Sequence, residues 1–260
     1  MTVPERSPLD EAIERHEKLR AEAPYQEQLK RLDALTFGFI NTIRVCWFAS
    51  TRDPENPRCL FWRFIDDLLA SAMAIALLVR QGVDRPARRE LRFILELVIR
   101  NLYVDTVFAS RETPLETRLA YVEHRLEQKD IQLLAELNWN LIDDAERFEA
   151  VTKRLYGELS TYTHPSHVQM ASRLDQAERG AYLGFETSVE LSAFNDLLER
   201  TYDVILVYVF EALGPSSTGD VFINVIDELP DWPFAATAFL SAISASYDYK
   251  HERQSKEAGP

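Results

Sequence analysis

The residues best suited to chemistry lie in one segment, 154–167, which reads RLYGELSTYTHPSH. Tyr156, Ser160 and His164 recur every four residues, so on a helix two hydroxyls and an imidazole share one face. Pro165 disfavours a helical conformation for the residue before it and should end the helix at His164. The partial negative charge of a helix C-terminus favours an imidazolium, which suits proton donation or anion contact. A histidine tied to a nearby carbonyl or carboxylate fits the same residue types.

A second polar set lies within the apolar segment 86–111. Its charged residues recur three or four positions apart, which places them along one edge of a helix that is apolar around most of its circumference. They are Arg89, Arg92, Glu96 and Arg100. Two interpretations stay open: the edge is either the solvent face, where Glu96 pairs with the arginines on both sides of it, or one wall of a polar cleft.

These features together resemble a HEPN-like helical domain. The resemblance rests on the charged edge and on the residues that follow it, namely Tyr121, Tyr156, Leu159, Ser160, Tyr162, His164, Pro165 and Ser166. More narrowly, the chain resembles a broad group of uncharacterised bacterial proteins with a tyrosine–leucine–serine–histidine–serine signature, over residues 59–213. The resemblance implies a bundle built around a core of four or five helices, often dimeric, and a link to phage-defence or toxin–antitoxin systems.

Active HEPN proteins are metal-independent ribonucleases. An arginine four to six residues before a histidine stabilises the phosphate, and the histidine moves the 2′-hydroxyl proton. This chain has Glu158, Leu159 and Ser160 at those positions. The nearest upstream arginine, Arg154, lies ten residues before His164 and points about 80° away from it on an ideal helix.

The first hypothesis is therefore a HEPN-like accessory or effector protein of a bacterial defence or toxin–antitoxin system, with a polar cleft between helices 86–111 and 141–164. If the chain is an enzyme, His164 acts with Arg100 and Glu96 in metal-independent RNA cleavage. The residues expected to bind or to position groups in this cleft are Arg92, Arg154, Ser160, Tyr162 and Tyr156. The second hypothesis is a non-catalytic interaction module in which the same cluster locks two helices together. A third is a small-ligand pocket in the bundle.

The charge and the hydropathy of the chain limit the classes of partner that it is expected to bind. The 29 basic and 42 acidic residues give a net charge of −13, which repels polyphosphate at long range. General DNA binding is therefore not expected, RNA is expected only at a local cleft, and the expected partner is another protein or a second copy of the chain. The most apolar run, Leu68 to Val79, is shorter than the roughly twenty residues that a bilayer requires. The N-terminus has no apolar signal segment, so we expect a cytoplasmic protein without a membrane partner.

No cofactor or metal is expected. The sequence contains no glycine-rich phosphate loop, nucleophile elbow or dinucleotide fingerprint. None of its five histidines follows a glutamate at the three-residue spacing of ferritin-like metal sites. Cys46 and Cys59 lie beside aromatic residues and are expected to be buried, reduced thiols.

Apolar spacing and helix-start signals predict an all-α, multi-helix bundle. The predicted helices span 9–22, 25–50, 59–82, 86–111, 114–137, 141–164, 188–213, 218–228 and 232–249. Ser7, Thr113 and Thr187 are the predicted N-terminal caps.

The domain organisation follows from the same pattern. Residues 1–24 form a charged N-terminal helix or extension, 25–249 a single helical domain with its HEPN-like core at about 59–213, and 250–260 a disordered polar tail. Only 179–186, with alternating apolar residues, indicates a minor extended segment.

For two apolar features, the sequence does not decide between packing on the chain's own core and packing on another molecule. The long apolar helices 59–82 and 188–213, where Ala70 and Ala74 permit close approach, either belong to the core or, if a stripe among them is exposed, form a dimer seam. The aromatic residues between Trp232 and Phe239 either pack on the chain's own core or form a docking patch.

Overall fold

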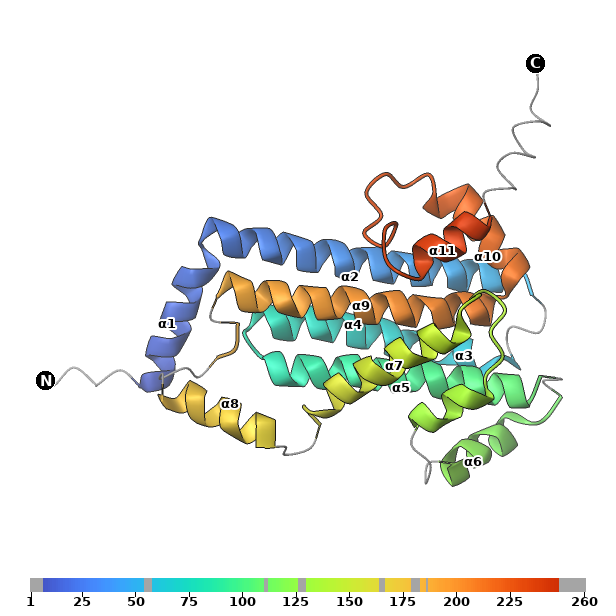
Figure 1. The fold of residues 1–260 in the computed structure, drawn as a ribbon, viewed down its shortest axis with the longest axis horizontal. Coiled ribbons are helices and arrows are strands. Elements are labelled where there is room, and N and C mark those ends of the chain that lie inside the picture. Colours follow the sequence, from blue (N-terminus) through green and yellow to red (C-terminus); the bar gives the residue numbers. More distant parts are fainter. Residues whose placement is uncertain are drawn as a thin grey trace, which may run out of the picture.

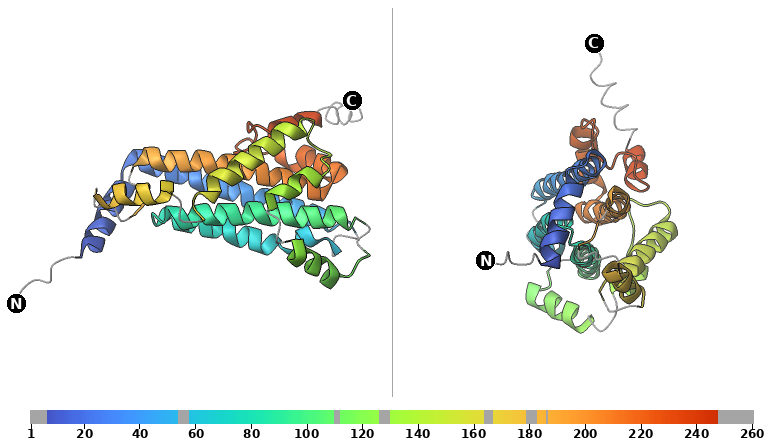
Figure 2. Two further views of the ribbon diagram at one scale, coloured as in Figure 1. Left: turned by 60° about the horizontal axis from the view of Figure 1, so that its bottom comes forward. Right: turned by 90° about the vertical axis from the view of Figure 1, so that its left-hand side faces the viewer.

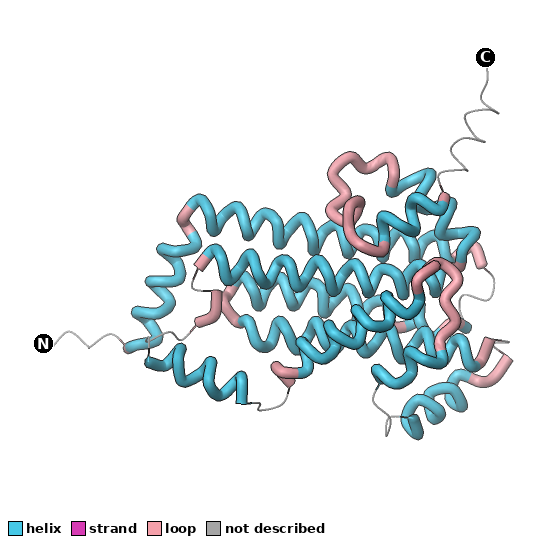
Figure 3. The backbone as a smooth tube through the Cα atoms, in the orientation of Figure 1, coloured by secondary structure: helices cyan, strands magenta, loops and turns pink. Residues whose placement is uncertain are grey.

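The computed structural model of this protein describes residues 7–53, 58–109, 112–125, 130–163, 167–178, 183–185 and 187–247. The regular structure in these ranges is helical, and they contain no strand (Figure 3). The all-α class predicted from the sequence is therefore confirmed. None of the described helices has the length and apolar character needed to cross a membrane.

Four long helices lie side by side at the centre of the bundle (Figure 1). They are α2 (Ala23–Ser50), α4 (Ile65–Arg80), α5 (Asp84–Val107) and α9 (Ser188–Leu213). α9 is the innermost, because every residue from Thr201 to Glu211 is buried and a helix that is apolar all round must be covered on all sides. α5 packs against both α4 and α9, as the apolar circumference of its sequence predicts.

Two of the three predicted caps, Ser7 and Thr187, begin helices, whereas the helix after Thr113 begins at Leu115, one residue later than that cap predicts. Ser7 begins α1 (Pro8–Arg20): its hydroxyl accepts a hydrogen bond from the Asp10 amide at 3.2 Å, and the Asp10 carboxylate accepts one from the Ser7 amide at 3.2 Å. At the start of α9 the Thr187 hydroxyl accepts from the Glu190 amide at 3.1 Å. Each hydroxyl satisfies an amide that a helix N-terminus otherwise leaves without an intrahelical acceptor.

Shorter helices lie at both ends of the bundle (Figure 2). α1 and α8 (His167–Glu178) lie near the start of α9, whereas α10 (Pro215–Val221) and α11 (Leu240–Ser246) lie near its end. The predicted N-terminal helix is thus present, and it buries only Ala12 and His16.

The predicted helix 59–82 is wrong in one respect, because it is broken at Phe64 into α3 (Leu60–Arg63) and α4. A carboxylate from another helix determines where α3 begins. The buried Asp105 of α5 accepts hydrogen bonds from the amides of Leu60 and Phe61 at 2.9 and 2.8 Å. It therefore caps α3 from outside that helix, and no local sequence signal reports such a contact.

The C-terminal prediction needs the same kind of correction. Residues predicted as helices 218–228 and 232–249 form α10, a π-helical turn at Phe222–Ile226, a run of turns and α11. The buried Asp203 of α9 accepts hydrogen bonds from the Phe239 and Leu240 amides at 3.3 and 3.2 Å, which places the start of α11 at residue 240. The predicted tail, 250–260, lies outside the described residues.

Two further predictions differ from the structure. The predicted helix 114–137 becomes α6 (Leu115–Arg125) and a 3-10 helix, η2 (Asp130–Glu136), with residues between them outside the described set. α8 was not predicted at all. Of the predicted extended segment 179–186, only 183–185 and their contacts are described: they form bends, and the Gly184 amide donates to the Gly82 carbonyl at 2.8 Å.

The aromatic residues near the C-terminus pack on the chain's own core. Trp232, Phe234 and Phe239 are all buried, and the Trp232 indole donates to the Thr42 hydroxyl at 2.9 Å. A docking patch made of these rings is therefore excluded. Cys46 and Cys59 are buried thiols, as predicted, and the Cys59 thiol donates to Asp105 Oδ2 at 2.8 Å.

Candidate functional site

The end of α7 (Ala145–Ser160) meets the first half of α5, as the predicted cleft requires. Asp144 caps α7 by accepting a hydrogen bond from the Arg147 amide at 3.0 Å. The helix then buries Phe148, Thr152, Leu155, Tyr156 and Leu159, whose spacing of three or four residues forms one apolar face. Residues 161–163 continue as a turn, so α7 ends earlier than residue 164, where its end was predicted.

Arg92 is the centre of the contact between the two helices. Its Nε and Nη2 donate to Glu96 Oε1 at 3.0 and 2.9 Å, and Nη2 also donates to the Tyr156 hydroxyl at 2.9 Å. Its Nη1 donates to the Thr163 hydroxyl. The Arg92 side chain is only 12% exposed. The charged edge of α5 therefore faces α7, and the Arg92–Glu96 pair forms along the helix as well.

The other predicted site residues have different neighbours. Ser160 donates to the Tyr156 carbonyl of its own helix, and the Tyr162 carbonyl accepts from Arg89 Nε at 2.9 Å. Arg154 is exposed on α7.

The predicted catalytic pair is not brought together by any described contact. Arg100 is partly buried on α5 and lies eight residues, about 12 Å along the helix axis, beyond Arg92. His164, Pro165 and Ser166 lie outside the described residues. A meeting of the His164 imidazole with Arg100 therefore stays a prediction.

The Arg92 cluster has the chemistry of a structural network. Its guanidinium nitrogens donate to a carboxylate and two hydroxyls of the same chain, and these charge-assisted bonds are stronger than neutral ones. The Thr163 hydroxyl in turn donates to the Ser160 carbonyl at 2.8 Å. A guanidinium held in this way joins α5 to the end of α7 and leaves little donor capacity for a substrate.

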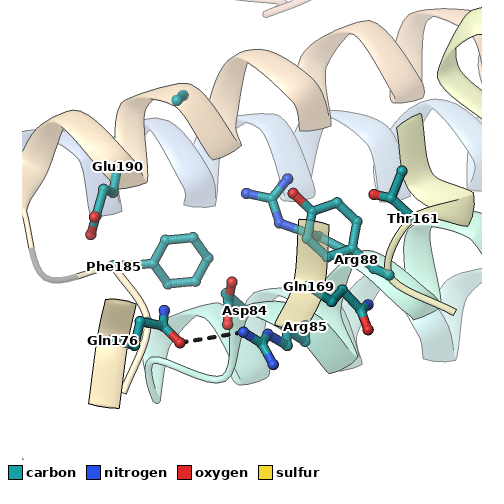
Figure 4. A pocket seen from close by; sticks show the side chains of 11 residues that line it. Asp84, Arg85, Arg88, Thr161, Gln169, Gln176, Phe185 and Glu190 are labelled. Carbon is teal, nitrogen blue, oxygen red and sulfur yellow. Dashed lines mark hydrogen bonds between the residues drawn. The ribbon is translucent and has the colours of Figure 1, made fainter. Parts of the chain in front are cut away.

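A pocket of about 310 Å³ opens next to this cluster, between the first turns of α5 and α9, the end of α7, and α8 (Figure 4). Its charged lining residues come from α5 and α9, and they balance: Asp84, Arg85, Arg88 and Glu190. Arg85 Nη2 donates to the Gln176 side chain of α8 at 3.4 Å. Tyr162 and Phe185 supply aromatic walls.

Arg88 is the residue that our sequence reasoning missed. Its Cζ lies 4.7 Å from the ring centroid of Tyr162 and 5.2 Å from that of Phe194, so the guanidinium contacts two aromatic rings. Its Nε is buried without a hydrogen-bond partner among the described residues. The spacing of Arg85, Arg88 and Arg92, three and then four residues, could have indicated a shared helix face.

No metal cluster accompanies this pocket. Across the described parts of the chain, no group of three histidine, cysteine or acidic side chains is placed to hold a metal ion.

Comparisons of the chain with protein-family models, with curated proteins and with solved structures gave no match. The HEPN-like resemblance therefore stays a prediction from the sequence.

Proposed function

We propose that this protein is a HEPN-like interaction module that acts by binding another protein molecule, as an accessory or effector component of a phage-defence or toxin–antitoxin system. The observation that carries this proposal is an exposed apolar surface on two neighbouring helices, which we call the α2–α4 face. It consists of Phe37, Ile40 and Trp47 on α2 with Leu69, Ala70, Met73 and Leu77 on α4.

Two contacts show that these stripes are adjacent. Arg80 near the end of α4 forms an ion pair with Asp33 near the start of α2. At the other end of the seam, Ile40, Arg44 and Trp47 line a hollow together with Ile65, Asp66 and Leu69. The helices therefore run antiparallel, and Ile40 and Trp47 of α2 lie beside Leu69 of α4.

The exposure on this face is unusually large for apolar side chains. Phe37 is 69% exposed, Met73 53% and Leu77 59%. Contiguous apolar surface of this kind marks interaction sites, and burying each such side chain contributes roughly 1.5–3 kcal/mol. A partner that covers the face would gain this free energy.

The partner we propose is a second copy of the chain. Asp66 lies seven positions before Met73 on α4, and Arg80 lies seven positions after it. In an antiparallel pair of α4 helices centred on Met73, each Asp66 would face the Arg80 of the other copy, and Leu69 would face Leu77. A two-fold interface requires this kind of self-complementarity, and antiparallel helix dipoles also attract.

The oligomeric state tests the proposal. Light scattering after size exclusion should give a dimer for the wild type and a monomer for Met73→Glu, because the substitution places two charges at the centre of the interface. Val189→Glu is the matched control, since Val189 is 74% exposed on α9, outside the face, and this variant should stay dimeric. A wild type that is monomeric at high micromolar concentration contradicts the second copy as partner.

Salt gives an independent readout. Each copy carries a net charge of −13, so two copies repel each other at long range, and this repulsion is screened by salt. The dimer should therefore become tighter as the salt concentration rises. Dissociation by salt would show that ion pairs rather than apolar contacts hold the copies together.

The alternative function is a metal-independent ribonuclease that uses His164 with Arg100 and Glu96. The closed network around Arg92 favours the interaction module, because that network commits Glu96 and the nearest cation to holding helices together. Incubation of RNA with the wild type and with His164→Ala, in the presence of a chelator, separates the two. Cleavage by the wild type that the variant lacks would replace our proposal with the nuclease.

A further inference from the structure

The pocket beside α5 contains a guanidinium whose hydrogen-bonding capacity the described protein does not use. Arg88 forms no hydrogen bond or ion pair with another described residue, and its Nε is buried. Its neighbours on the same helix differ, since Arg85 donates to Gln176, Arg89 to a carbonyl and Arg92 to Glu96. Arg88 lines the pocket, and no described residue accepts a hydrogen bond from its remaining guanidinium N–H groups, which a ligand in the pocket would satisfy.

The shape of the free donor set selects the partner. The guanidinium lies near the rings of Tyr162 and Phe194, and no described residue accepts a hydrogen bond from the N–H groups along its edge. Figure 4 shows this group directed toward the space that Phe185 and Glu190 border on the other side. A planar carboxylate accepts two parallel hydrogen bonds from such an edge, which is the strongest arrangement that a guanidinium makes.

A second charged group in the same pocket also lacks a partner. Asp84 lies one helical turn before Arg88, and among the described residues nothing donates a hydrogen bond to its carboxylate or forms an ion pair with it. It is held against the chain at Gly184, where an added Cβ would come within 2.8 Å of the Asp84 carboxyl carbon. A cationic group on a ligand would satisfy it.

We infer that this pocket binds a small zwitterion of the α-amino-acid class, with its carboxylate on Arg88 and its ammonium on Asp84. Among the described residues, the charged groups that line the pocket sum to zero net charge, which favours a ligand that is neutral overall, and Asp84 and Glu190 repel a dianion such as phosphate. The volume of about 310 Å³ lies at the lower end of the range for ligand pockets, which suits a small molecule. The aromatic walls are available to its side chain. This inference is independent of the proposed dimer.

Thermal unfolding with single ligands is the first test. The twenty standard L-amino acids are added one at a time at millimolar concentration, beside acetate, methylamine and inorganic phosphate. We expect at least one amino acid to raise Tm, because a ligand that binds only the folded state stabilises it, and neither acetate nor methylamine alone should match it. No increase with any amino acid, or a larger increase with phosphate, would overturn the inference.

Titration calorimetry of the selected amino acid then tests the two contacts. Arg88→Gln and Asp84→Asn should each raise Kd at least about tenfold, since each loses a charge-assisted interaction. Arg200→Gln is the matched control: this arginine lies on α9, its side chain is 51% exposed, and it does not line the pocket, so Kd should be unchanged. Circular dichroism and the Tm of each unliganded variant verify that it is folded. Unchanged binding by folded Arg88→Gln would refute the site.

Discussion

Replacing Tyr156 by phenylalanine tests whether the Arg92 cluster is structural. The substitution keeps the ring, which lies 4.5 Å from the guanidinium carbon of Arg92, and removes only the hydroxyl that accepts from Arg92 at 2.9 Å. A hydrogen bond to a charged group contributes about 1.5–3 kcal/mol. Because Arg92 keeps its bonds to Glu96, we expect a loss near the lower bound, about 1.5 kcal/mol.

The assay is urea unfolding together with thermal unfolding. For a chain of this size each kcal/mol shifts Tm by about 2–4 °C, so the expected decrease is about 3–6 °C. Tyr162→Phe is the matched control, because it too removes a tyrosine hydroxyl at the end of the α5–α7 contact, and the described structure gives that hydroxyl no hydrogen bond. It should change the free energy of unfolding by less than about 0.5 kcal/mol.

The result that would refute this reasoning is equal stability of Tyr156→Phe and the wild type. The contact of the Arg92 guanidinium with α7 would then contribute nothing to stability. The charged edge of α5 would in that case be better interpreted as the wall of an open, substrate-facing cleft. A double-mutant cycle with Glu96→Gln extends the test. Non-additive losses are expected, because both residues share the same guanidinium.

Three further predictions concern stability elsewhere. Arg118→Met should cost about 3 kcal/mol or more in urea unfolding, because it removes the cation that pairs with the buried Asp105 carboxylate, whereas Arg200→Met at the exposed pair with Glu158 should cost at most about 1 kcal/mol. Burial lowers the pKa of His16 from its usual 6.5, so the folded state binds this proton less tightly than the unfolded state does, and stability is lost as the pH falls through and below 6.5. In a pH series the His16→Gln variant should lack this loss of stability. Identical pH profiles of the variant and the wild type would contradict the prediction. Gly157→Ala should raise the free energy of unfolding by about 0.5–1 kcal/mol, since a Cβ there meets nothing within 4 Å. Gly38→Ala should lower it, because its Cβ would lie 2.5 Å from a ring carbon of Pro233.

Local signals in the sequence identified much of the fold. The hydroxyls of Ser7 and Thr187 cap the helices that they were predicted to begin, because capping depends on residues only three positions apart. The charged edge of α5 was also visible from its spacing. Whether that edge faced solvent or α7 was decided by Tyr156, a residue 64 positions after Arg92, and periodicity within one helix carries no information about such a partner.

The errors have the same origin in distant contacts. α3 and α11 begin where Asp105 and Asp203 accept hydrogen bonds from their first amides, and these carboxylates belong to other helices. Burial raises the pKa of Asp203 above its usual range, against the hydrogen bonds that lower it, so this contact also has an electrostatic cost. A reading of local propensity cannot place a helix start that a buried side chain from elsewhere determines.

Arg88 and Arg92 lie on the same helix, and their contacts suit different roles, ligand binding for Arg88 and stability for Arg92. They are one turn apart, and both lie close to a tyrosine ring near the end of α7. Arg92 has a carboxylate and two hydroxyls of its own chain as acceptors, whereas Arg88 lies near two aromatic rings and has no acceptor among the described residues. Because an unsatisfied buried donor lowers stability, a fold that needed only rigidity would gain from an apolar residue at position 88. The guanidinium there is therefore better explained by a ligand that completes it than by the packing of the bundle.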